Sequence, residues 1–156
     1  MTSYFDAMSC LARRLMPVFA TALGLPPDFF DDKFDRPTAL LRPLKYAAAA
    51  SNPQQGVMAA GAHSDYGVLT ILAVDDAPGL QIQTDAAKDE WRDVPPVPGA
   101  FVCNVGDLCE RWTNGVFKST VHRVVTKGGA GSERYSCAFF WWGGAGRPHQ
   151  TQVESA

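Results

Sequence analysis

The chain has 156 residues and a mass of 16.9 kDa, which is typical of a single domain. Hydrophobic residues make up 46% of it and aromatic residues 11%, enough to form a core, and this excludes a disordered chain. With 14 Lys and Arg against 16 Asp and Glu, the net charge of -2 gives no electrostatic basis for binding nucleic acid or an anionic membrane surface. No apolar run reaches the roughly 18 residues that span a bilayer, and the N-terminus does not resemble a secretory signal. We therefore expect a cytoplasmic protein.

The first predicted element is a helix over residues 3–23, because apolar residues recur there at spacings of three and four. Ser3 and Asp6 resemble a capping box at its start, and Gly24 before two prolines predicts its end. Since Pro17 lies inside the pattern, we expect a kink or two shorter helices. Residues 28–34 predict one more short helical piece.

From Pro37 onward, short apolar runs alternate with glycine and proline, a pattern typical of a β sandwich or barrel. A short helix is expected at 107–113, with Asp107 as its N-cap, and a polar connection of small residues at 47–62. The predicted strands are 40–46, 68–74, 79–84, 90–94, 100–105, 117–125 and 135–142. We expect a helical segment over 1–36, a mainly β domain over 37–144 and a polar tail over 145–156.

The four cysteines are scattered along the chain without a CxxC pair or a pattern of disulfide partners. Cys103 and Cys137 lie within apolar runs, where a free cysteine behaves as a small hydrophobic residue. We expect the cysteines to be reduced and mostly buried.

Two of the three histidines could contribute to a metal site. His63 and Asp65 are two residues apart, so their side chains project from the same face of an extended segment. His122, in a predicted strand, could supply a third ligand. Two imidazoles and one carboxylate on one face of a metal are typical of non-haem Fe(II) oxygenases. From the residues alone, a structural role for His122 stays open, and His149 in the polar tail is expected to be solvated.

Arg134 and Ser136 share one face of the last predicted strand. A guanidinium can bind a carboxylate through two hydrogen bonds, and a neighbouring hydroxyl helps to orient it. An arginine buried in so apolar a strand requires an anionic partner. The alternative is that Arg134 pairs with a surface carboxylate at the end of the strand.

Four segments together resemble a known family: HSDYGVLTIL (63–72), PGLQIQ (78–83), PGAFVCNVGDLCERWTNGVFKSTVHRVV (98–125) and RYSCAFFWW (134–142). They are similar to the catalytic domain of the iron(II)/2-oxoglutarate-dependent dioxygenases, and more narrowly to the isopenicillin N synthase-like branch. The resemblance spans roughly residues 38–142, and the helix that precedes them also fits.

The resemblance implies a double-stranded β-helix, or jelly roll, that encloses an iron ion. It implies that His63, Asp65 and His122 are the Fe(II) ligands. It also implies that Arg134 and Ser136 hold the distal carboxylate of the cosubstrate 2-oxoglutarate.

Three further residues are weaker candidates for the site. Tyr46 matches a family tyrosine that adds a hydroxyl to the same cosubstrate, although Ala47 stands where the family usually has proline. Phe140 has the strand parity of Arg134 and is expected either to face the substrate or to pack in the core. Asn104 precedes a predicted turn and is expected to stabilise it, an approach to the site being the alternative.

The implied activity is the oxidation of a small organic substrate, by C–H hydroxylation or a related reaction, with O₂ consumed and succinate and CO₂ released. One alternative is an Fe(II)-dependent oxidase of the same family that does not use 2-oxoglutarate, and another is an inactive jelly-roll binding module. A zinc hydrolase is less favoured because no general base is evident beside the histidines.

Members of this branch also carry regions before the matched helix and after the last matched strand, and these regions have no counterpart in the 156 residues. A fragment, a naturally reduced enzyme and a chain completed by oligomerisation all fit this difference. In each case we expect exposed sheet edges and an open pocket in the chain itself.

Overall fold

The computed structural model describes residues 1–129 and 133–144, so the predicted polar tail and His149 lie outside the described residues. The helical elements are α1 (Thr2–Ala22), the short 3-10 helices η1 (Asp31–Phe34) and η2 (Pro53–Gln55), and α2 (Asp107–Trp112). The strands are β1 (Pro37–Tyr46), β2 (Ala60–His63), β3 (Leu69–Val74), β4 (Leu80–Asp85), β5 (Glu90–Asp93), β6 (Val102–Val105), β7 (His122–Val124) and β8 (Arg134–Gly144).

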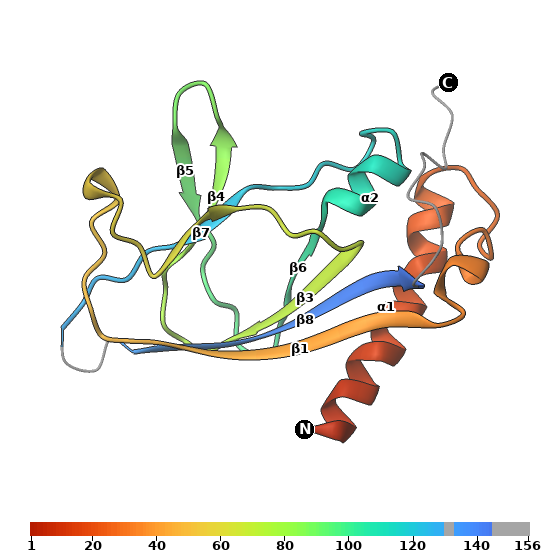
Figure 1. The fold of residues 1–156 in the computed structure, drawn as a ribbon, viewed down its shortest axis with the longest axis horizontal. Coiled ribbons are helices and arrows are strands. Elements are labelled where there is room, and N and C mark those ends of the chain that lie inside the picture. Colours follow the sequence, from red (N-terminus) through yellow and green to blue (C-terminus); the bar gives the residue numbers. More distant parts are fainter. Residues whose placement is uncertain (130–132, 145–156) are drawn as a thin grey trace.

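The strands of the described part form two four-stranded antiparallel sheets, shown in Figure 1. The strand order is β1-β8-β3-β6 in the first sheet and β2-β7-β4-β5 in the second. Strands that are distant in sequence are therefore neighbours, as β1 and β8 are along their whole length. This is the predicted mainly β jelly roll with an N-terminal helix.

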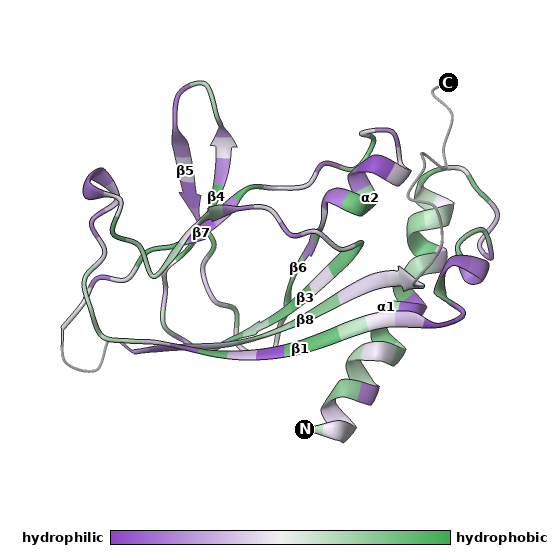
Figure 2. Ribbon diagram, in the orientation of Figure 1, coloured by the Kyte–Doolittle hydropathy of each residue, from purple (hydrophilic) through white to green (hydrophobic). Residues whose placement is uncertain are grey.

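The hydrophobic core lies between α1 and the outer face of the first sheet, not inside the jelly roll. One stripe of α1 is fully buried, at a spacing of four residues: Met8, Ala12, Met16 and Ala20. It belongs to the same cluster as buried residues of β3, α2 and β8, among them Leu69, Ile71, Trp112, Phe139 and Trp141. Figure 2 shows hydrophobic residues along α1 and β3, and hydrophilic residues in η1 and β5.

Strand β8 separates this core from the interior of the jelly roll. Arg134, Ser136 and Phe140 face a cavity between the sheets, whereas Phe139 and Trp141 belong to the core with α1. The alternation follows from the two-residue period of a β-strand. The interior therefore stays available for a binding site while the outer face supplies the packing.

Helix α1 confirms the predicted helix but differs from the prediction in detail. It is one element that continues through Pro17, so two shorter helices are wrong. Its N-cap is Met1 without a side-chain hydrogen bond, so the Ser3–Asp6 capping box is also wrong. Its end is as predicted: Gly24 has a φ of 71°, and its amide donates to Thr21 O at 3.0 Å.

Three other local predictions need correction. The strand predicted over 117–125 is confined to β7, because α2 binds the backbone just before it. The connection over 47–62 contains η2 and β2. Asp107 is the first residue of α2 and Gly106 is its N-cap.

The cysteines are free, as predicted, but they are not mostly buried: Cys109 is buried and Cys137 partly so, whereas Cys10 and Cys103 are exposed. Cys103 is exposed because β6 is an edge strand. Among the described residues, no helix combines the length and apolar character that crossing a membrane requires.

Candidate functional site

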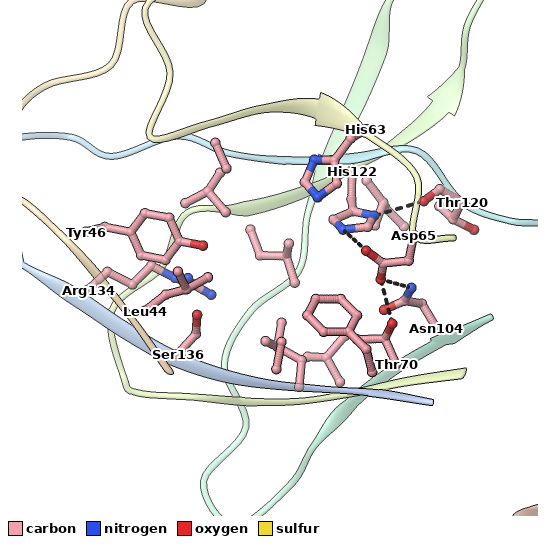
Figure 3. Close-up of a pocket in the computed structure, with 18 residues that line it drawn as sticks. Leu44, Tyr46, His63, Asp65, Thr70, Asn104, Thr120, His122, Arg134 and Ser136 are labelled. Atoms are coloured by element: carbon pink, nitrogen blue, oxygen red, sulfur yellow. Dashed lines mark hydrogen bonds and ion pairs between the residues drawn. The ribbon is translucent and has the colours of Figure 1, made fainter. Parts of the chain in front are cut away.

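A cavity of about 90 Å³ lies between the two sheets. A single buried water needs only about 10–15 Å³ on this measure, so the cavity has room for a small ligand. Its walls combine apolar side chains from both sheets with two groups of polar residues, which Figure 3 shows. One group contains His63, Asp65 and His122, and the other contains Arg134, Ser136 and Tyr46.

The three predicted metal ligands converge at this cavity. His63 and His122 are directly paired across β2 and β7, and their ring centroids are 4.4 Å apart. Asp65 follows the end of β2, and its Oδ1 lies 3.8 Å from His122 Nε2. One ligand atom from each residue lies within 4.8 Å of the other two, close enough to bind a single ion.

Backbone carbonyls orient both imidazole rings. His63 Nδ1 lies 2.7 Å from Gly61 O, and His122 Nδ1 lies 3.0 Å from Thr120 O. A carbonyl oxygen only accepts, so each Nδ1 carries the proton and, in the neutral ring, the lone pair is on Nε2. Histidine ligands of metals are commonly held in this way.

The Asp65 carboxylate is buried, with an exposed fraction of 6%. Its Oδ2 accepts a hydrogen bond from Thr70 Oγ1 at 2.7 Å and another from Asn104 Nδ2 at 2.8 Å. Asn104 therefore approaches the site, and the expectation that it stabilises a turn is wrong. Its separation from Asp65 by 39 residues left no local signal in the sequence.

Helix α2 holds the backbone around Asp65. The Asp107 amide donates to Asp65 O at 2.7 Å, and Ser64 Oγ donates to Asp107 Oδ2 at 3.1 Å. Gly106 packs so closely that an added Cβ would clash with the carbonyl oxygens of Asp65 and Gly67. Glycine is therefore required where α2 meets the segment that carries two predicted ligands.

The second polar group surrounds a buried arginine. Arg134 is 2% exposed, and no carboxylate of residues 1–129 or 133–144 forms an ion pair with it. Arg134 Nε and the buried Ser136 Oγ lack hydrogen-bond partners within the described part of the chain. The alternative pairing of Arg134 with a surface carboxylate is therefore absent there. An unpartnered cation and hydroxyl on one cavity wall fit an anionic ligand.

Tyr46 and Phe140, the two remaining predicted site residues, also line the cavity. Tyr46 pairs with Arg134 across β1 and β8, its ring centroid lies 5.2 Å from Arg134 Cζ, and Figure 3 shows its hydroxyl directed into the cavity. Phe140 lines the cavity opposite Thr70 and also contacts Trp142, with 5.8 Å between ring centroids.

Known proteins are similar to this chain in sequence and in fold. Residues 41–141 match the family model of the 2OG-Fe(II) oxygenase superfamily. A 2-oxoglutarate-Fe(II) type oxidoreductase of Emericella nidulans, hxnY, is 39% identical over 141 residues, which are 90% of this chain and 40% of that protein.

Two solved structures have the same fold. A full-length Neurospora crassa protein in complex with alpha-KG and 5-formyluracil is 35% identical, with a TM-score of 0.81, over 90% of this chain and 47% of that chain. JOX2 in complex with 2OG, Fe and JA is 34% identical, with a TM-score of 0.85, over 98% of this chain and 45% of that one.

The chain therefore spans less than half the length of each of these relatives. The isopenicillin N synthase-like branch stays a prediction, but the broader family is confirmed. Because the family model covers residues 41–141, and relatives align over nine-tenths of the chain at 35% and 39% identity, the chain belongs to the 2OG-Fe(II) oxygenase superfamily.

Proposed function

We propose that this chain binds Fe(II) and 2-oxoglutarate and carries the reaction centre of an oxygenase for a small organic substrate. The observation that carries the proposal is the pairing, in one cavity, of a cluster of two histidines and an aspartate with a buried arginine that lacks a carboxylate partner within the described residues. Metal and dicarboxylate sites on their own are common. Their combination in a member of this family favours this chemistry.

In this proposal, His63, Asp65 and His122 hold the iron. These residues provide the two imidazoles and one carboxylate that are typical of non-haem Fe(II) oxygenases. Because each Nδ1 is bound to a backbone carbonyl, Nε2 of each ring is available to bind the metal. When bound, iron and 2-oxoglutarate supply the O₂-dependent oxidation of a substrate C–H bond, with succinate and CO₂ released.

The opposite group of polar residues would position the cosubstrate. Arg134 would neutralise one carboxylate of 2-oxoglutarate, Ser136 would donate to it, and Tyr46 would orient it through its hydroxyl. The apolar remainder of the wall, including Leu72, Leu80 and Ile82, excludes water from the bound anion and strengthens its attraction to the guanidinium.

The proposed substrate class is argued from the small molecules bound in the structures of relatives. The Neurospora crassa protein is solved with 5-formyluracil and JOX2 with JA, in addition to the cosubstrate, and both occupants are small molecules. We propose a small organic substrate for this chain as well, with Phe140 facing it. A cytoplasmic location, and the lack of nucleic-acid and membrane partners, stay predictions from composition.

The proposal is tested by loading the chain with Fe(II) without oxygen and then adding 2-oxoglutarate. We expect a visible metal-to-ligand charge-transfer absorption, and succinate once O₂ is admitted. Asp65→Ala should abolish both signals, whereas the exposed Asp76→Ala should leave them intact.

The same experiment separates the alternatives. Iron binding without any response to 2-oxoglutarate would favour an Fe(II) oxidase of the same family. A folded chain that binds no iron would favour a jelly-roll binding module and overturn the proposal.

A further inference from the structure

The Asp65 carboxylate has two oxygens, and their surroundings differ. Oδ2 accepts two hydrogen bonds, from the Thr70 hydroxyl and the Asn104 amide, whereas Oδ1 lies 3.8 Å from His122 Nε2. We propose that Thr70 and Asn104 are positioning residues that reserve Oδ2, so that Asp65 binds the metal through Oδ1 alone. The inference rests on the proposed function, because it presumes a metal at this cluster.

The two donors form a rigid pair. Thr70 on β3 and Asn104 on β6 are directly opposite each other in the antiparallel ladder, so the sheet itself fixes their spacing. A carboxylate only accepts hydrogen bonds, so both groups donate to it. Thr70 is 3% exposed, and water therefore competes poorly for these bonds.

This arrangement matters because a free carboxylate can bind a metal through both oxygens. With both oxygens bound, Asp65 would occupy one more position on the metal, and that position would be lost to exchangeable ligands. Hydrogen bonds to an ionised oxygen are among the stronger ones in proteins. Two of them on Oδ2 therefore hold the carboxylate in the orientation that leaves this position open.

The test uses Mn(II) as the probe, with the whole chain and without cosubstrate. Thr70→Val and Asn104→Leu each remove one donor with little change in volume, and the double variant removes both. The number of water molecules bound to Mn(II) is measured by electron–nuclear double resonance in isotopically labelled water. The Mn(II) dissociation constant is measured by titration.

We expect the double variant to bind about one water fewer than the unaltered chain, because Oδ2 is then free to bind Mn(II). We also expect each single variant to weaken Mn(II) binding by about 10-fold, as loss of a hydrogen bond to a metal ligand typically does. Thr70→Ser keeps the hydroxyl and should restore both values. Thr38→Val, an exposed change of the same kind on β1, is the matched control.

An equal water number in the double variant and the unaltered chain would overturn the inference and leave the proposed function standing. If the unaltered chain binds no Mn(II), both fall. Should Thr70→Val impair folding, which the melting temperature of the metal-free protein reports, the Mn(II) dissociation constant of Asn104→Leu decides, since Asn104 is only partly buried. An affinity equal to that of the unaltered chain would then overturn the inference.

Discussion

At the scale of single residues, Arg134 is a buried cation that no carboxylate of the described residues neutralises. Its guanidinium is almost fully buried, and within the described residues it contacts the Tyr46 ring but no carboxylate. A buried charge without a partner destabilises the folded state, so the residue lowers stability until an anion binds.

Arg134→Met should therefore act in opposite directions on folding and binding. Replacing the charge by an apolar side chain of similar length should leave the metal-free chain as stable as before, or more stable by about 1 kcal/mol or more. The KM for 2-oxoglutarate should rise steeply, because recognition of its carboxylate is lost. Urea unfolding and succinate assays measure the two effects.

Arg42→Met is the matched control, because Arg42 is exposed on β1 and should change neither quantity. An unchanged KM in Arg134→Met would indicate that the cavity does not bind 2-oxoglutarate through this side chain. It would favour the oxidase alternative.

Desolvation raises the pKa of the thiols of Cys103, Cys109 and Cys137, and Cys109 is the only fully buried one of the three. Burial, and secondarily the charge of Glu110, raise the pKa of the Cys109 thiol to about 12. At pH 8 only about one thiol in 10⁴ is then the reactive thiolate. Iodoacetamide should therefore alkylate the exposed Cys10 of the native chain and spare Cys109 until the chain unfolds, as peptide mass spectrometry will show.

The raised pKa of the Cys109 thiol also makes the stability of the folded chain depend on pH. The unfolded chain loses this proton near its ordinary pKa of 9.0, whereas the folded chain keeps it up to about 12. The contribution of Cys109 to stability is therefore complete below pH 9. It falls by up to about 1.4 kcal/mol per pH unit above that. Rapid alkylation of native Cys109 at pH 8 would contradict this account.

At the scale of elements, α2 joins the two segments that carry the proposed iron ligands. Its first amide binds the Asp65 carbonyl, and Glu110 accepts from the Ser119 amide at 2.7 Å, three residues before His122. The hydroxyl of Thr113 also accepts from the Phe117 amide at 3.2 Å. A short helix thus sets the distance between chain segments that lie more than fifty residues apart.

Gly106→Ala tests this role of α2. The added methyl group meets the carbonyl oxygens of Asp65 and Gly67, so the segment must move, at a cost of about 1–3 kcal/mol. We expect lower stability together with weaker Mn(II) binding. Gly61→Ala enters open space and is the matched control for stability. Unaltered metal affinity in Gly106→Ala would mean that α2 does not position Asp65.

The sequence predicts the elements, and the residues that converge at the cavity, better than it predicts individual contacts. HSDYG and the later His122 carry the family pattern, so all three proposed ligands can be found from it, as can Arg134 and Ser136. The cap of α2 could not be identified, since Gly106 takes that place because of backbone packing against a distant loop. The role of Asn104 could not be predicted either, because it depends on the pairing of Asn104 with Thr70 across two strands.

At the scale of the whole molecule, the core and the proposed site lie on opposite faces of the first sheet. Edge strand β1 has no neighbour on its outer side among the described residues. Its Pro43 lacks an amide donor, and the charged Arg42 and Lys45 are exposed. These features oppose pairing with another chain at this edge.

Metal binding should stabilise the entire chain, because the ligands come together only in the folded state. At a free metal concentration 100 times the dissociation constant, the gain is about 2.7 kcal/mol. For a chain of this length that corresponds to a rise in Tm of roughly 5–10 °C. Calorimetry with Mn(II) measures it. Asp65→Ala should show no rise, and an equal rise in that variant would place the metal elsewhere.

The alternation along β8 has a consequence for how this chain must fold. A shift of one residue against β1 and β3 would keep most of the backbone hydrogen bonds. It would, however, turn Arg134 and Ser136 to the outside and bring Phe139 and Trp141 inside. Such a misaligned molecule could be compact and still have no place for an anion. Accuracy to a single residue in strand alignment is therefore a condition of ligand recognition, and not only of stability.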